Sequence, residues 1–147
     1  MTTTKESQKE QIDSLPRVSG RVLIVDDEVV LAGLLKDELE QVGYAVETAS
    51  TAAAGMEKWR EHAAEIVILD YNLPDRLGDE LLVEICQEHP CSTVIMMTGD
   101  PNPGLAAEWF GKGASGYLQK PFEIEQLIRL CERNRCGRLL GVLQAKT

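Results

Sequence analysis

The 147-residue sequence contains no apolar run that approaches the ~20 residues needed to span a bilayer. Its first residues, from Met1 to Glu6, also lack the apolar core of a signal peptide. Basic side chains are few, since 15 Lys and Arg stand against 24 Asp and Glu and give a net charge of −9. Nucleic-acid surfaces depend on clustered Lys and Arg, so this balance argues against direct nucleic-acid binding. We therefore expect a cytoplasmic protein with no membrane partner and no direct nucleic-acid partner.

Two common kinds of binding motif are absent as well. No Gly-x-Gly-x-x-Gly or Walker sequence follows any of the apolar runs, which disfavours a nucleotide-binding protein. The cysteines Cys86, Cys91, Cys131 and Cys136 form two Cys-x4-Cys pairs, not the tight Cys-x2-Cys pairs of common zinc sites. Free cysteines in a reducing cytosol are usually buried small hydrophobes. A four-cysteine metal site is therefore disfavoured.

The sequence does contain a set of short segments that each end at a polar side chain. The four cases are Val22–Val25 before Asp26-Asp27, Ile66–Leu69 before Asp70, Val94–Met97 before Thr98, and Gly116–Gln119 before Lys120. Aliphatic runs rich in β-branched residues predict buried parallel strands. Open α/β sheets place their active sites at the carboxyl ends of such strands. Three carboxylates, one hydroxyl and one ammonium group are therefore expected along a single edge of the sheet.

The order of the elements predicts a single α/β domain. Strands are expected at 21–25, 45–48, 65–69, 92–97 and 115–119, and helices at 29–41, 51–62 and 79–88, around Trp109-Phe110, and after Pro121. Ser50 or Thr51 is expected to cap the second helix. The first helix carries apolar residues at helical spacing, namely Val30, Leu31, Leu34, Leu35, Leu39 and Val42. Alternating strands and helices predict a parallel sheet covered on both faces, which is a three-layer α/β/α sandwich.

This ordered set resembles the receiver domain of two-component response regulators, the CheY-like superfamily. The matching residues are Asp26-Asp27, Asp70, Leu73-Pro74-Asp75, Gly78, Thr98, Tyr117 and Lys120-Pro121-Phe122, within about residues 21–134. The resemblance implies a flavodoxin-like (β/α)5 receiver fold with a five-stranded parallel sheet, in which the helices of Cys86 and Cys131 lie on opposite faces. We expect a flexible polar leader at 1–20, the receiver domain at 21–135, and a C-terminal tail or the start of a linker at 136–147.

The acidic residues predict a metal site. Three like charges are unfavourable together unless a hard cation lies among them, and Mg2+ fits that need, with Mn2+ as a substitute. The resemblance implies that Asp27 and Asp70 ligate the metal directly, together with the backbone carbonyl of Asn72. It implies that Asp26 acts largely through bound water.

Asp70 is the candidate nucleophile for a phosphoryl group, because a carboxylate needs no deprotonation and its acyl phosphate can hydrolyse again. Lys120, held by a Pro121 that follows a cis bond in this family, is expected to neutralise charge on the phosphoryl oxygens. Thr98 can donate its hydroxyl to the phosphoryl group. The resemblance implies that Thr98 then moves towards the phosphate and Tyr117 turns inward. That movement changes the surface of the fourth helix, fifth strand and fifth helix.

The resemblance also implies how long the phosphoryl group remains. Asn72 and Asp100 stand two residues past Asp70 and Thr98, where receivers flank the path of the hydrolytic water. Both side chains are small and polar, so they are expected to orient water and give fast self-dephosphorylation.

The leading interpretation is a phosphorelay switch and not an enzyme that turns over an external substrate. Its expected partners are a sensor histidine kinase or a phosphotransfer protein, and a downstream protein or output domain. A Mg2+-dependent phosphohydrolase of the haloacid dehalogenase type is one rival, but there the nucleophile comes first in the chain and the acidic pair last. A receiver that signals without phosphorylation is another, although its usual mark is the loss of an acidic residue or the lysine.

One feature departs from the family pattern. Trp109 and Phe110 stand where receivers usually carry a small residue and a medium aliphatic one, so we expect one of them at the surface or the helix shifted outward. Nearby Pro and Gly residues weaken this helix. After residue 134, Leu139, Val142 and Leu143 again fall at helical spacing. The tail could form a helix packed on a second chain, a linker towards a further domain, or a disordered end. Of these we expect a homodimer formed through the last helix and this tail, aided by the exposed aromatic of Trp109-Phe110.

Overall fold

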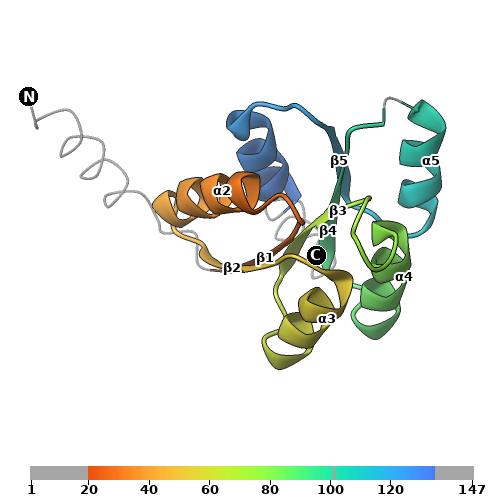
Figure 1. Ribbon diagram of the computed structural model, residues 1–147, viewed down its shortest axis with the longest axis horizontal. Coiled ribbons are helices and arrows are strands. Elements are labelled where there is room, and N and C mark those ends of the chain that lie inside the picture. Colours follow the sequence, from red (N-terminus) through yellow and green to blue (C-terminus); the bar gives the residue numbers. More distant parts are fainter. Residues whose placement is uncertain (1–19, 101, 135–147) are drawn as a thin grey trace, which may run out of the picture.

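The computed structural model describes residues 20–100 and 102–134. Five strands form one parallel sheet in the order β2-β1-β3-β4-β5 (Figure 1). They are β1 (Arg21–Val25), β2 (Ala45–Ala49), β3 (Ile66–Asp70), β4 (Thr93–Thr98) and β5 (Gly116–Gln119). Every residue of the central strands β3 and β4 is buried, as expected for strands covered on both faces. The five predicted strands are therefore confirmed.

Helices cover both faces of this sheet. They are α2 (Val29–Gln41), α3 (Ala52–Glu61), α4 (Gly78–Glu88) and α5 (Pro103–Gly111), and residues 124–134 are also helical. The helices α3, α4 and α5 pack on one face, whereas α2 and the helix over 124–134 pack on the other (Figure 1). The predicted three-layer sandwich is confirmed.

Local signals set the helix ends as the sequence predicts. The hydroxyl of Thr51 accepts the N–H of Ala54 at 3.1 Å, so Thr51 is the cap of α3. The helix α2 ends before Gly43, whose φ of 106° lies in the region that favours glycine. Asn102 caps the nine-residue helix α5, which begins at Pro103.

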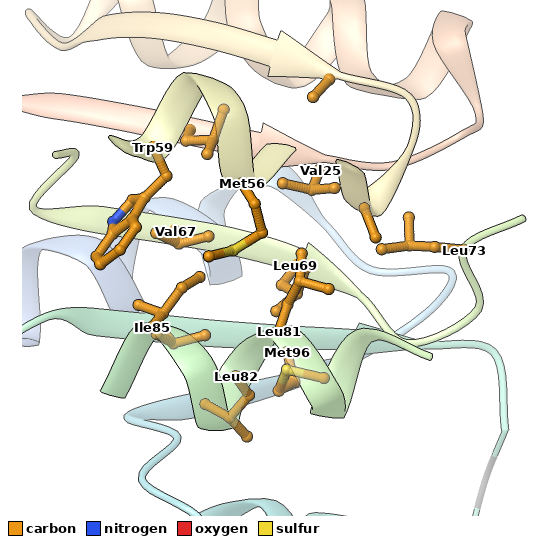
Figure 2. Packing of buried hydrophobic residues seen from close by; sticks show 14 of the residues in the cluster. Val25, Met56, Trp59, Val67, Leu69, Leu73, Leu81, Leu82, Ile85 and Met96 are labelled. Carbon is orange, nitrogen blue, oxygen red and sulfur yellow. The ribbon is translucent and has the colours of Figure 1, made fainter. Parts of the chain in front are cut away.

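The core on the α3 and α4 face is built from long aliphatic residues, two methionines and tryptophan. Figure 2 shows Val25, Met56, Trp59, Val67, Leu69, Leu73, Leu81, Leu82, Ile85 and Met96 in this core. Leu81, Leu82 and Ile85 of α4 are buried, whereas Cys86 of the same helix is partly buried. Cys86 packs against this core and Cys131 belongs to the core of the opposite face, which confirms that their helices are separated by the sheet.

The predicted helix α2 is confirmed, but not all of its apolar residues are buried. Val30 and Leu34 fall within the helical spacing but are 80% and 59% exposed, and Val29 is 72% exposed. The buried residues of α2 are Ala32, Leu35 and Leu39, which lie on the stripe that faces the sheet. The apolar residues of α2 occupy a wider arc than one sheet face can cover, so part of them faces outward.

The aromatic pair of α5 divides as predicted, with one ring inside and one outside. Trp109 is fully buried, whereas Phe110 is 50% exposed. The predicted leader, Cys136 and the tail lie outside the described residues, so the predictions for them remain predictions. Within residues 20–100 and 102–134, no helix is long and apolar enough to cross a membrane.

Candidate functional site

The polar residues that follow the strands meet at one edge of the sheet. Val25 lies beside Leu69, so Asp26 follows β1 next to Asp70 at the end of β3. Thr98 ends β4 and lies beside Gln119, directly before Lys120. Parallel strands bring their carboxyl ends to the same edge, which is why residues distant in sequence converge here.

The three aspartates form a compact acidic cluster. Oxygens of Asp26, Asp27 and Asp70 lie within 4.8 Å of one another, with Asp26 and Asp70 buried and Asp27 exposed. Burial, and after it the negative charge of Asp26, raise the pKa of Asp70 to about 6, against the lowering effect of Lys120 and the N–H of Asn72. Crowded carboxylates with an open side are the donor set that a hard divalent cation prefers. The cluster therefore fits Mg2+.

Lys120 forms ion pairs with two aspartates of this cluster and with the neighbouring Glu28. Its ammonium lies 2.9 Å from Asp26, 3.2 Å from Glu28 and 3.6 Å from Asp70. Burial alone would lower the pKa of Lys120, but the hydrogen bond and charge of Asp26 and the charge of Asp70 outweigh it, so the pKa is raised. The Lys120–Pro121 bond is cis, as the resemblance implies. Glu28 was not among the predicted site residues, although it directly follows the acidic pair.

The loop after Asp70 is held tightly against the site. An added Cβ at Gly78 would lie 2.1 Å from the backbone oxygen of Asp70, so no larger residue fits there without a shift. Gly78 also donates its N–H to the carbonyl of Tyr71 at 2.7 Å, and Asn72 forms a β-bridge with Leu77. The loop therefore returns on itself and holds Asn72 beside Asp70.

Asp75 joins the same loop to helix α3. Its carboxylate accepts the N–H groups of Ala52 at 2.8 Å and Ala53 at 2.9 Å, in the first turn of α3. These two bonds lower the pKa of Asp75. The sequence indicated a Leu-Pro-Asp turn but not this contact, which joins residues more than 20 positions apart.

The remaining predicted residues lie at the rim and behind it. Thr98 is fully buried, and its hydroxyl accepts the N–H of Asp100 at 3.0 Å. The side chains of Asn72 and Asp100 are exposed, and Tyr117 is half-buried on β5. The structure therefore brings Asp26, Asp27, Asp70 and Lys120 into one cluster, with Thr98 buried at the end of the neighbouring strand.

Comparisons with known proteins agree with this geometry. The family model for the response regulator receiver domain matches residues 22–132. The response regulator protein FleR of Pseudomonas aeruginosa is 33% identical over 124 residues, which cover 84% of this chain and 26% of FleR. The chain therefore spans about a quarter of the length of that relative.

Two solved structures resemble the fold closely. A CheY-like receiver domain protein from Methanospirillum hungatei JF-1 superposes with a TM-score of 0.75 at 32% identity, covering 80% of this chain and 95% of that one. The BeF3-activated receiver domain of DrrB gives a TM-score of 0.74 at 29% identity, covering 80% and 97%. The sheet order and the acidic edge agree with a family model that spans most of the chain. The chain therefore belongs to the receiver domains of two-component response regulators.

Proposed function

We propose that this protein is a phosphorylation-dependent switch in which Asp70 accepts a phosphoryl group from a sensor histidine kinase or a phosphotransfer protein. The observation that carries the proposal is the convergence of three carboxylates and Lys120 at one sheet edge. A structural role alone gives no reason to bury two like charges beside each other, because their repulsion costs folding free energy.

The residues support transfer to Asp70. A carboxylate oxygen of Asp70 would attack the phosphorus, forming an O–P bond as the P–N bond to the donor histidine breaks. With a pKa of about 6, Asp70 is mostly ionised at neutral pH. Asp27, Asp70 and the carbonyl of Asn72 would hold Mg2+ or Mn2+, with Asp26 acting through water. When bound, the metal supplies positive charge to the carboxylates and the phosphoryl oxygens.

Lys120 and Thr98 would bind oxygens of the new phosphoryl group. Lys120 lies 3.6 Å from Asp70 and binds Asp26 more closely, so its ammonium can turn to a phosphoryl oxygen by a small movement. The hydroxyl of Thr98 accepts one hydrogen bond and keeps its own proton to donate. We propose that its movement lets Tyr117 turn inward and changes the surface of α5, β5 and the helix over 124–134. Asn72 and Asp100, exposed at the rim, would orient the water that later hydrolyses the acyl phosphate.

An apolar groove beside the site supports docking of the phosphodonor. The groove has a volume of about 560 Å³, and its lining residues are Glu28, Leu31, Leu34, Leu35, Glu38, Lys120, Pro121, Phe122 and Ile124. It includes the exposed Leu34 of α2 and borders Lys120, which lies 3.6 Å from Asp70, so a protein bound there would reach Asp70. This surface also gives a reason for the apolar residues that α2 leaves uncovered. The downstream partner, the homodimer and the cytoplasmic location stay predictions.

Intact-mass measurement tests the proposal. With Mg2+ and acetyl phosphate, the wild-type protein should gain one phosphoryl group, and Asp70→Ala should gain none. Asp37→Ala, which removes an exposed carboxylate of α2, is the matched control and should be labelled like the wild type. Labelling of Asp70→Ala, or labelling that persists after the metal is chelated, would contradict the proposal.

A further inference from the structure

Three aromatic rings connect the phosphoacceptor strand to the far edge of the sheet. The indole of Trp109, from α5, lies with its ring centroid 5.1 Å from that of Tyr71 and 6.0 Å from that of Tyr117. The ring planes are tilted by 50° and 52°, which is an ordinary contact geometry for aromatic pairs. Tyr71 directly follows Asp70, and Tyr117 lies on β5. Trp109 therefore contacts both the loop of the phosphoacceptor and the aromatic residue of the edge strand.

The indole is buried but has no polar attachment. Trp109 is 0% exposed, and its Nε1–H has no hydrogen-bond partner among the described residues. A buried donor without an acceptor is unfavourable, so no hydrogen bond fixes the ring in its position. Ring packing alone determines where the indole lies, and any movement of a neighbouring ring changes that packing.

The helix that carries Trp109 has few other attachments. It is nine residues long and contains Gly104 and Gly111, both poor helix formers. Beyond its end, Lys112 pairs with Asp79 at 3.3 Å and with Glu108 at 2.9 Å, and exposed ion pairs of this kind contribute little. Trp109 is also the only residue of α5 that is fully buried. Leu105 also packs against the core but is only partly buried, so the indole is the largest buried group that holds α5 on the sheet.

Tyr117 is only half-buried while it lies against this indole. A large ring beside it occupies space that Tyr117 would need in order to lie deeper, because protein interiors leave few voids of that size. An inward movement of Tyr117 thus requires the indole to move as well.

We propose that Trp109 is the positioning residue of the switch, whose indole holds Tyr117 half-exposed and moves with it, and with α5, when Asp70 carries a phosphoryl group. This inference rests on the proposed function. It assigns to this chain a third aromatic residue between the phosphoacceptor and the surface that changes.

The two tryptophans of the chain supply an internal control. Trp59 is also buried, with no partner for its Nε1–H among the described residues, but its ring packs against His89 and its helix α3 packs on β1 and β2. We would prepare Trp59→Phe, in which only Trp109 emits, and Trp109→Phe, in which only Trp59 emits. Mg2+ and beryllium fluoride, the phosphoryl mimic named for DrrB, would be added to each. The emission of Trp109 should shift, and that of Trp59 should not.

Native mass spectrometry of the same samples separates the two hypotheses. If the mimic binds and the emission of Trp109 does not change, the role of Trp109 is wrong while the proposed function stands. If the mimic binds neither variant nor the wild type, the proposed function fails and this inference fails with it.

The affinity for beryllium fluoride separates the proposed role of Trp109 from a purely structural one. Trp109→Ala removes the obstacle to Tyr117 and should bind beryllium fluoride more tightly, by roughly five-fold or more, the lower end of typical coupling between linked sites. Trp109→Phe should fall between wild type and Trp109→Ala. In a Tyr117→Ala background, the Trp109 substitutions should no longer change the affinity. A lower unfolding midpoint with unchanged or weaker affinity would overturn the proposal, and Trp109→Phe decides the matter if Trp109→Ala does not fold.

Discussion

Helices α3 and α5 lie on the same face of the sheet and differ in how they are attached. The first turn of α3 is fixed by the hydroxyl of Thr51 and by the carboxylate of Asp75, and its Trp59 packs deep in the core. In the first turn of α5 the side chain of Asn102 accepts the N–H of Gly104 and Leu105 is only partly buried, and Trp109 is the one fully buried residue of the helix. Helix α3 is therefore bonded to the loop that follows Asp70, whereas α5 has no such bond among the described residues. This difference favours a fixed chemical site joined to a surface that can change.

The largest expected effect is on the packing of α3. Trp59→Ala should lower the free energy of unfolding by about 3–5 kcal/mol, because it removes a fully buried aromatic ring from the core. Phe110→Ala, on the exposed side of α5, should change it by less than about 0.5 kcal/mol. Urea denaturation followed by circular dichroism would measure both. Equal losses would contradict the burial of Trp59 and the exposure of Phe110.

Gly78→Ala should disturb the loop that joins Asp70 to α4. Its Cβ would lie 2.1 Å from the backbone oxygen of Asp70, and relief of this clash should cost about 1–3 kcal/mol of unfolding free energy. Phosphorylation by acetyl phosphate should slow, because Asp70 itself must shift. Gly33→Ala, where nothing lies within 4 Å of the added Cβ, is the control and should show neither effect. A Gly78→Ala protein with normal stability and labelling would contradict this account of the loop.

Asp75→Asn should weaken the contact between the loop and α3 in a pH-dependent way. The pKa of Asp75 in the folded protein lies below its ordinary value of 3.8, because the N–H groups of Ala52 and Ala53 favour the charged form. The stabilisation is therefore complete above about pH 4 and is lost as the pH falls through the lowered pKa. Unfolding midpoints of wild type and Asp75→Asn should differ at pH 7 and converge in acid. A difference that is constant down to acid pH would show that the charge of Asp75 contributes nothing.

The smallest effect is expected from Gly111→Ala at the end of α5. An added Cβ there meets nothing within 4 Å, so the loss of freedom in the unfolded chain should stabilise the protein by about 0.4–1 kcal/mol. The same substitution should make α5 firmer and reduce the response of Trp109 to beryllium fluoride. Thermal unfolding and the emission of the Trp59→Phe, Gly111→Ala protein would show whether the two effects occur together.

Much of this arrangement could be predicted from the sequence because it depends on local signals. Aliphatic runs identify the strands, and the carboxyl ends of parallel strands bring Asp70 and Lys120 to one edge whatever the loops do. The contacts of Asp75 with α3 and of Glu28 with Lys120 could not be predicted, because they depend on the path of a loop and on the direction of a side chain. The sequence also could not show which apolar residues of α2 face outward, since spacing alone does not show how wide a stripe the sheet covers.

The course of the described chain also bears on how such a module can be built into larger proteins. The strand β1 begins at the edge opposite Asp70, and the helix over 124–134 starts beside Lys120 and runs back, so that Leu130 packs near Gly116 at the start of β5. Eleven helical residues span about 16 Å, at 1.5 Å each. The backbone therefore enters and leaves on the side of the sheet away from the acidic edge. A protein segment genetically fused at either point would start on that far side and leave the approach to Asp70 open.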